Sequence, residues 1–283
     1  MTSHDVVAKV RRATGIKKVG HAGTLDPLAT GVLVLCLGKA TRLSEFIMAH
    51  TKVYAAEIRL GIITDTYDAE GEVVHADSTP VSAEQVSAIL PEFTGEIEQI
   101  PPMYSAIKRA GKKLYELARE GKTVERPARR VDITALYLTN WDFPRFSLQV
   151  TCSPGTYIRS LAHDIGERLG VGAHLAALRR VSSGDAFRVE NAVAFDTLLA
   201  AIQRDDWQQF LIGADVALAD IPRIELDSEQ SQQVQRGGFL RLNCHEPGPI
   251  RVHDPGGNLV ALMSRRSADD GEPPLWKPMK VFA

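Results

Sequence analysis

The sequence predicts an α+β fold: a mixed, largely antiparallel sheet that is crossed by a cleft and flanked by helices, followed by a small all-β module. Residues 51–60 alternate between two faces, as a half-buried strand does. Helical stretches and further strands follow up to residue 182. From residue 221 short apolar runs are separated by Gly and Pro turns. We therefore expect two domains, at residues 1–220 and 221–283.

The other elements can be assigned from local patterns. Ser82 and Gln85 have the spacing of a helix capping box, and Thr156 is a candidate N-cap. The expected elements are, in order, a helix capped by Thr2 or Ser3 and ending near Gly15, a buried strand at 32–35, a helix at 39–48, the strand at 51–60, a helix at 82–90, an amphipathic helix at 112–120, strands at about 131–139 and 145–152, and a helix after Thr156.

The composition is that of a globular protein and gives no sign of a metal site. The chain has 283 residues, of which 44% are hydrophobic and 24% charged, and no stretch approaches the about 18 consecutive apolar residues of a membrane span. The N-terminus lacks the pattern of a secretory signal, so we expect a cytoplasmic protein. The three cysteines are Cys36, Cys152 and Cys244, too widely spaced for a zinc ribbon or a disulfide framework. The histidines show no metal-ligand spacing either.

The net charge of −2 conceals a strong segregation of charge. Residues 1–50 hold seven Lys or Arg and three Asp or Glu, residues 51–107 hold two and ten, and residues 108–130 hold nine and three. Such basic blocks can follow the phosphates of a nucleic acid while the acidic blocks face away. Charge alone fits an ordinary solvated face equally well.

Residues 20–31 place a single carboxylate, that of Asp26, within a run of turn formers and small residues. Its three glycines permit backbone conformations that other residues avoid, and Pro27 restricts the residue before it. An isolated Asp-Pro pair would most simply begin a turn. Twelve consecutive positions of this composition instead favour a rigid loop that carries a reactive group.

The run Gly-His-Ala-Gly-Thr-Leu-Asp-Pro-Leu-Ala-Thr-Gly at residues 20–31 resembles the signature of the TruB family, the bacterial tRNA pseudouridine synthases that act on uridine 55 of the T-loop. The resemblance implies the pseudouridine synthase fold and makes Asp26 the essential catalytic residue. Lys52-Val53-Tyr54 resembles a second family motif, which implies that Tyr54 lies against the target base and, as a catalytic residue, handles the C5 proton. From the residues alone, a tyrosine at this point of a strand is more simply a core residue.

A third motif of the family resembles Gly-Thr-Tyr-Ile-Arg at residues 155–159. The resemblance implies that Arg159 pairs with Asp26 and that Tyr157 packs under the active site. An arginine in the first turn of a helix is electrostatically out of place, so a carboxylate partner would explain it. Such a cation would lower the pKa of the carboxylate by about 1–3 units.

Further substrate-binding residues follow from the same resemblance. The acidic run at residues 64–71 lacks the spacing of a calcium loop, and in the family it lies beside the active site. The residues implied to bind the substrate are His21, Gly23, Thr24, Leu25, Asp68, Tyr157 and Leu178, with His21 filling the space that a flipped base leaves and Leu178 lining the base pocket.

The basic segment at about 102–130 resembles the family's mobile thumb, which closes over the RNA. Its cations implied to contact the RNA are Lys108, Arg109, Lys112, Lys113, Arg129 and Arg130. The module at 221–283 resembles a PUA domain, which in the family holds the distal part of the tRNA. Family members normally begin earlier, with a strand carrying a Lys-Pro pair, whereas this sequence begins Met1-Thr2-Ser3. We therefore expect either that the start codon has been placed too late or that the protein lacks an edge of its sheet and a basic contact.

The expected activity is the isomerisation of uridine 55 in the tRNA T-loop to pseudouridine, with no metal and no cofactor, by a monomer that binds the T-loop and T-stem. Asp26 would act either as a nucleophile or as a base, and the sequence does not choose between them. Two alternatives remain, a non-catalytic RNA-binding protein and a subunit of a guide-RNA-directed particle. A retaining glycosidase is disfavoured because no convincing second carboxylate is present.

Overall fold

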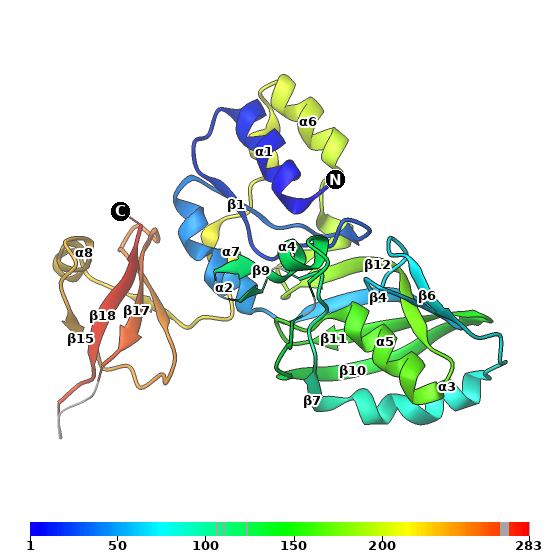
Figure 1. Ribbon diagram of the computed structural model, residues 1–283. Coiled ribbons are helices and arrows are strands. Elements are labelled where there is room, and N and C mark those ends of the chain that lie inside the picture. The colour runs from blue at the N-terminus through cyan, green and yellow to red at the C-terminus, as the bar shows by residue number, and fades with distance from the viewer. Residues whose placement is uncertain (106, 110, 123, 267–271, 283) are drawn as a thin grey trace. The chain divides into compact units, whose positions relative to one another are not determined.

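The computed structural model describes residues 1–105, 107–109, 111–122, 124–266 and 272–282, without the side chains of residues 108, 109, 113, 115 and 119. The chain forms two compact units, each built from several segments (Figure 1). The first comprises Met1–Val6, Gly23–Val34 and Met48–Ala192, and the second comprises Val7–Ala22, Leu35–Ile47 and Val193–Ala283. The boundary expected at residue 220 stays a prediction.

A seven-stranded sheet forms the centre of the first unit (Figure 1). Six strands follow the order β13-β12-β4-β11-β10-β7 with antiparallel neighbours, and β2 pairs in parallel with β12. The predicted α+β fold with a mixed, largely antiparallel sheet is therefore confirmed. The strands are β2 (Thr30–Gly31), β4 (Lys52–Leu60), β7 (Gly95–Gln99), β10 (Arg129–Asp142), β11 (Arg145–Cys152), β12 (Ala173–Ser183) and β13 (Phe187–Arg188).

The alternation predicted for residues 51–60 appears in β4. Ala56, Ile58 and Leu60 are buried on the face that joins the main hydrophobic core. Tyr54 lies on the same face by the two-residue period of a strand and is half-buried against that core. The strand therefore holds its tyrosine at the border between the core and the protein surface.

Helix α5 (Ile158–Leu169) packs on the sheet through an apolar stripe (Figure 1). Its buried Ile158, Leu161, Ala162 and Ile165 have the spacing of one helix face. At Gly166 an added Cβ would lie 2.1 Å from the Ala173 nitrogen, so only glycine allows this approach of α5 to the start of β12. Helix α3 (Ala83–Ile89) lies beside α5 and begins with the predicted capping box of Ser82 and Gln85.

Three local predictions need correction, and the choice between Thr2 and Ser3 as the cap of the first helix is resolved. Residues 38–49 form a 3-10 helix, Gly38–Leu43, and then helix α2 (Ser44–Ala49), rather than one helix. Val32 and Val34 are buried without being in a strand. The Val32 N–H donates to the Arg180 carbonyl, and regular strand pairing begins only at β3 (Leu35–Leu37). The N-cap of α5 is Tyr157, since the Thr156 hydroxyl donates to the Ser153 carbonyl instead. Helix α1 (Ser3–Thr14) is capped by Thr2, which exchanges two hydrogen bonds with Asp5.

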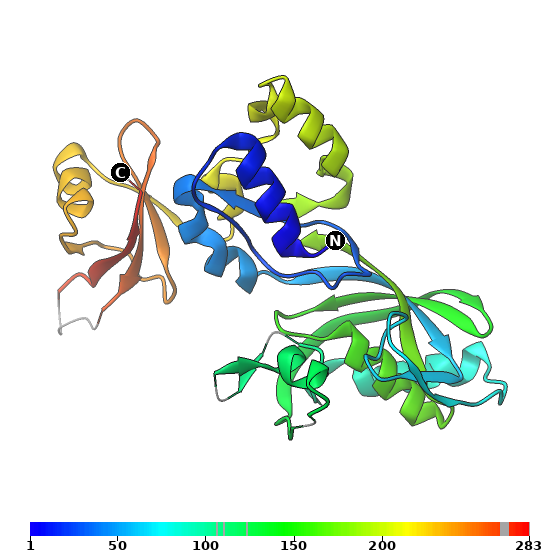
Figure 2. The same ribbon diagram turned by 45° about the horizontal axis from the view of Figure 1, so that its top comes forward.

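The second unit contains a five-stranded sheet in the order β14-β16-β17-β18-β15, a β half-barrel with α8 packed against it (Figure 2). The fully buried Trp276 belongs to its core. The predicted module is therefore present as a sheet, and helix α8 departs from the all-β expectation. The strands and helices are β14 (Arg223–Glu225), α8 (Ser228–Gln235), β15 (Leu240–Arg241), β16 (Ile250–His253), β17 (Leu259–Arg265) and β18 (Leu275–Val281).

The remaining elements are short. In the second unit β1 (Val19–His21) pairs with β3, and α6 (Phe195–Gln203), a 3-10 turn at Trp207–Phe210 and α7 (Ala214–Ala217) follow. A 3-10 turn at Val189–Asn191 follows β13 in the first unit. In the first unit a 3-10 turn at Leu90–Phe93 follows α3, and the hairpins are β5 (Ile62–Thr64) with β6 (Val73–Ala76) and β8 (Lys108–Arg109) with β9 (Lys112–Lys113), the latter leading into α4 (Leu114–Arg119). Within the described residues, no helix is both long and apolar enough to cross a membrane.

Candidate active site

Asp26 lies in the loop that leads to β2, and two close contacts fix this loop. Before Asp26, the Leu25 N–H donates to the buried Ser3 hydroxyl at 2.9 Å, and the same hydroxyl donates to the Leu25 carbonyl. After Asp26, Gly31 has a φ of +94°, and an added Cβ would lie 2.2 Å from the Arg180 carbonyl oxygen. The last glycine of the loop is thus required both by its backbone angle and by the adjacent strand β12.

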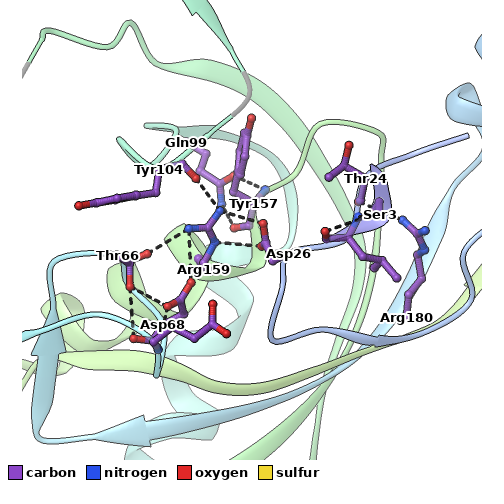
Figure 3. Close-up of polar contacts among 12 residues, drawn as sticks. Ser3, Thr24, Asp26, Thr66, Asp68, Gln99, Tyr104, Tyr157, Arg159 and Arg180 are labelled. Carbon is purple, nitrogen blue, oxygen red and sulfur yellow. Dashed lines mark hydrogen bonds and ion pairs between the residues drawn. The ribbon is translucent and has the colours of Figure 1, made fainter. Parts of the chain in front are cut away.

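The carboxylate of Asp26 is held by the guanidinium of Arg159 (Figure 3). Arg159 Nε donates to Asp26 Oδ2 and Nη2 donates to Oδ1, each at 3.0 Å, so the pair is bidentate. The Arg159 side chain is 5% exposed, whereas that of Asp26 is 31% exposed. A buried cation thus orients a carboxylate that stays partly exposed. This is the ion pair that the resemblance implied.

A second carboxylate lies on the other side of Arg159 (Figure 3). Asp68 Oδ2 is 3.4 Å from Arg159 Nη1, which also donates to the Thr66 carbonyl at 3.3 Å. Asp68 Oδ1 accepts from the Thr66 hydroxyl at 2.6 Å and from the Glu70 N–H at 3.1 Å. Asp68 therefore faces Arg159, and the contact with the nucleotide that the resemblance implies for it stays a prediction.

The start of the basic segment also contacts Arg159. The Tyr104 carbonyl accepts from Arg159 Nη2 at 2.8 Å. Close by, the Gln99 amide bonds both backbone groups of Tyr157, at 2.8 and 2.9 Å, and so fixes the residue that begins α5 (Figure 3). Gln99 has no recognisable sequence signal, because its importance arises only from the pairing of β7 beside α5.

Burial governs the ionisation of Asp26. Burial raises its pKa above the ordinary value, the Arg159 guanidinium lowers it through charge and hydrogen bonds, and the Asp68 carboxylate raises it again. Arg159 lowers this pKa as expected, but the net direction is upward. Desolvation of the charged carboxylate raises the pKa by more than Arg159 lowers it. The guanidinium of Arg159 is also shared with Asp68.

Tyr54 and Leu178 lie on one face of the sheet near this carboxylate. Tyr54 of β4 is opposite Arg180 of β12, and Ala56 is opposite Leu178, so their side chains share that face. Burial raises the pKa of Tyr54, and the charge of Asp26 contributes to the rise while Arg180 opposes it. The phenol is therefore protonated at neutral pH, within electrostatic range of Asp26.

Arg180 contacts the loop that carries Asp26, and the sequence analysis did not single it out. Its side chain is 1% exposed, and its three guanidinium nitrogens donate to the carbonyls of Val32, Thr24 and Gly23, at 2.7, 3.4 and 3.2 Å. The stretch around Leu178 was recognised, but a second arginine next to Arg179 gave no sign of which of the two is buried. Strand register decides this, because alternate residues face opposite sides.

The other predicted substrate-binding residues are more dispersed. His21 ends β1 in the second unit, and the Gly23 and Thr24 carbonyls face Arg180. Lys112 pairs with the exposed Glu120 at 3.0 Å. Arg129 and Arg130 are exposed at the start of β10, and the side chains of Lys108, Arg109 and Lys113 lie outside the described part. The roles of these residues stay predictions.

The sequence was compared with family models and curated proteins. The model of the TruB family pseudouridylate synthase N-terminal domain matches residues 11–158, and that of the tRNA pseudouridylate synthase B C-terminal domain matches residues 159–219. The chain belongs to the TruB family. Among TruB relatives, tRNA pseudouridine synthase B of Geobacillus thermodenitrificans is 43% identical over 100% of this chain and 96% of its own length. The protein of the same name from Burkholderia pseudomallei is 44% identical over 93% of this chain and 88% of its own length.

Solved structures agree with this TruB assignment. A Cbf5-Nop10-Gar1 complex contains a chain that matches with a TM-score of 0.78 at 25% identity, over 100% of this chain and 82% of that one. An H/ACA RNP bound to a substrate RNA containing 2'-deoxyuridine matches with a TM-score of 0.77 at 24% identity, again over 100% and 82%, and this second likeness shows the fold alone. The fold is therefore that of pseudouridine synthases, and the chain is an enzyme of this isomerase class.

Proposed function

We propose that this TruB-family enzyme isomerises uridine 55 in the T-loop of tRNA to pseudouridine, with Asp26 as the catalytic carboxylate. One observation carries the assignment: a partly exposed Asp26 is held by two 3.0 Å hydrogen bonds from a buried Arg159. The names of relatives that are 43% and 44% identical to this chain support tRNA as the substrate.

The reaction rearranges bonds without a net change in composition. The bond from N1 of the base to C1' of the ribose breaks, the base turns, C5 bonds to C1', and the C5 proton leaves as N1 gains one. The ionised carboxylate of Asp26 starts this sequence either by attacking C1' or by removing a proton from C2'. Both routes need an Asp26 carboxylate that is ionised and held in one orientation. The two hydrogen bonds from Arg159 favour both conditions.

A uridine inside a folded T-loop is stacked, so it must be flipped out to reach Asp26. Tyr54 and Leu178 are on the sheet face beside the carboxylate and supply an aromatic surface and an apolar wall. Stacking on such a surface contributes about 1–3 kcal/mol per base. We assign Tyr54 and Leu178 to binding of the flipped base, His21 to the space that it leaves, and Tyr157 to support of Arg159 from the start of α5.

Binding of the T-loop and T-stem is assigned to the exposed cations that follow the active site. Arg129 and Arg130 lie at the start of β10, and Lys112 lies in the basic hairpin formed by β8 and β9. The β half-barrel of the second unit is assigned to a more distal part of the tRNA. In this proposal the protein acts as a cytoplasmic monomer and needs neither metal nor cofactor.

The test uses the purified chain, unmodified tRNA transcript and carbodiimide mapping of pseudouridine. The wild type is expected to modify one T-loop position, and Asp26→Asn to modify none while its tRNA dissociation constant stays within a few-fold. Asn keeps the shape of the side chain but has no negative charge, so binding should survive. Asp142→Asn, at an exposed carboxylate at the end of β10, serves as the matched control and should keep wild-type activity.

The two alternatives give different results in the same assay. Substantial activity of Asp26→Asn would remove Asp26 from the catalytic role. A wild type that binds the transcript but modifies nothing would favour a non-catalytic RNA-binding protein. Modification only after addition of a guide RNA would favour a subunit of a guide-directed particle.

A further inference from the structure

Arg180 is a buried cation that contacts the catalytic loop on both sides of Asp26. Its Nη1 and Nη2 reach the Thr24 and Gly23 carbonyls, which precede Asp26, and its Nε reaches the Val32 carbonyl, which follows it. A single side chain thereby bridges the two ends of the segment that carries the carboxylate. A guanidinium suits this task because its donors are held in one rigid plane.

The main chain of Arg180 holds the same loop. Gly31 is the parallel partner of Arg180 between β2 and β12, and the Val32 N–H donates to the Arg180 carbonyl at 2.9 Å. The adjacent Thr30 hydroxyl donates to the Leu178 carbonyl at 3.4 Å. Side chain and backbone of one strand position therefore fix where the loop returns to the sheet.

The cost of burying this charge indicates that it has a specific task. Among the ion pairs of the described residues, none involves Arg180, although its side chain is 1% exposed. A buried cation that lacks a carboxylate is costly unless hydrogen bonds replace its hydration. Here those bonds go to carbonyls of the Asp26 loop, so the loop and the arginine satisfy each other only in this arrangement.

We propose that Arg180 is a positioning residue, which sets the place of the Asp26 carboxylate through the loop backbone while Arg159 sets its direction. This inference rests on the proposed catalytic role of Asp26. Arg180 touches loop carbonyls rather than the Asp26 carboxylate. Misplacement of a catalytic group by about 1 Å can reduce a rate about 100-fold. Loss of Arg180 therefore reduces the chemical step rather than the binding of tRNA.

The experiment compares Arg180→Lys and Arg180→Met under single-turnover conditions, with enzyme in saturating excess over tRNA transcript. Lysine keeps the charge but cannot bridge three carbonyls, whereas methionine fills similar space without a donor. We expect the rate per folded enzyme to fall about 10- to 100-fold for Met and less for Lys. The tRNA dissociation constant should stay within about threefold, since Arg180 is buried.

Two controls separate positioning from simple loss of structure. Circular dichroism and thermal melting give the folded fraction, and Arg179→Met, at the exposed neighbour on the other face of β12, should keep the wild-type rate. Gly31→Ala displaces the loop through a contact with the Arg180 backbone and leaves the guanidinium unchanged. It should also reduce the single-turnover rate while the affinity for tRNA stays nearly unchanged. Arg180→Lys, which keeps the charge at the same position, keeps the test decisive if Arg180→Met does not fold.

The pH profile supplies the readout that a purely structural role would not give. Because Arg159 still pairs with Asp26, the acid limb of the Arg180 variants should stay at the wild-type pH while the plateau falls. A rate within about twofold of wild type for Arg180→Lys, Arg180→Met and Gly31→Ala, or a loss entirely in affinity, would overturn the inference. If Asp26→Asn were active, the proposed function would fail instead, whatever the Arg180 variants do.

Discussion

At the scale of single residues, Asp26 shows how one carboxylate is kept both reactive and oriented. Burial raises its pKa, and Arg159 partly offsets this effect by pairing with the charged form. Asp68 acts in the opposite sense, because it is a second negative charge on the same guanidinium. The ionisation of Asp26 therefore depends on a balance among three side chains rather than on one ion pair.

The balance predicts the pH dependence of activity. The reaction needs ionised Asp26, so activity should fall as the pH drops through a pKa above the ordinary 3.8. Removing the cation with Arg159→Gln should move this acid limb to higher pH, and removing the second anion with Asp68→Asn should move it to lower pH. Single-turnover rates measured across pH check both directions. Shifts of the same sign in the two variants would contradict this electrostatic account.

At the scale of elements, the turn at residues 64–71 supports Arg159 through close packing. An added Cβ at Gly71 would lie 2.3 Å from Thr66 Oγ1 and 2.4 Å from Asp65 Oδ1. The Thr66 hydroxyl is the group that donates to Asp68. The glycine thus leaves space for a hydrogen bond that orients the partner of Arg159. Tyr67, in the same turn, has a φ of 62° and stacks on His163 of α5, with ring centroids 3.9 Å apart.

Gly71→Ala is therefore expected to reduce activity by displacing Thr66 and with it Asp68. Overpacking of this kind costs about 1–3 kcal/mol of stability, so the variant should fold while its single-turnover rate falls. Gly248→Ala is the matched control, since nothing lies within 4 Å of an added Cβ there. The single-turnover rate reports the effect on activity, and thermal melting reports the effect on stability. An unchanged rate in Gly71→Ala would show that Asp68 tolerates movement of the turn.

At the scale of the whole molecule, a protein with a net charge of −2 must bind a polyanion through local charge. Part of the basic segment is neutralised within the protein, because Lys112 and Lys122 both pair with Glu120. Arg129 and Arg130 are exposed, and Arg130 has only an exposed partner, Glu96, at 3.3 Å. Such a surface pair is weak and is easily exchanged for a phosphate.

The double variant Arg129→Gln and Arg130→Gln is expected to weaken tRNA binding and to reduce the slope of log affinity against log salt by about 1–2. The single-turnover rate at saturating enzyme should stay near wild type, because neither side chain contacts Arg159 or Asp26 in the structure. Titrations of tRNA at several salt concentrations measure the slope. Arg204→Gln, which removes an exposed arginine far along the chain, should leave it unchanged.

Much of the fold could be predicted because local patterns report local structure. The alternation in β4 and the capping box of Ser82 were read correctly from a few residues. The strand expected at 32–35 was wrong for residues 32–34, because Val32 bonds to Arg180 of β12 outside regular pairing and only Leu35 begins a strand. Apolar character shows that a residue is inside, but the partner that buries it decides whether a strand forms.

The sequence by itself determined the family and the sheet class, and its twelve-residue run at 20–31 made Asp26 the candidate for the catalytic role. Only the tertiary structure decided which residues act together at the site. Asp68 facing Arg159, Gln99 holding Tyr157 and Arg180 bridging the loop each join segments far apart in the chain. The physical reason is that charge and hydrogen bonding act over a few ångströms in space, and separation along the chain does not reveal those distances.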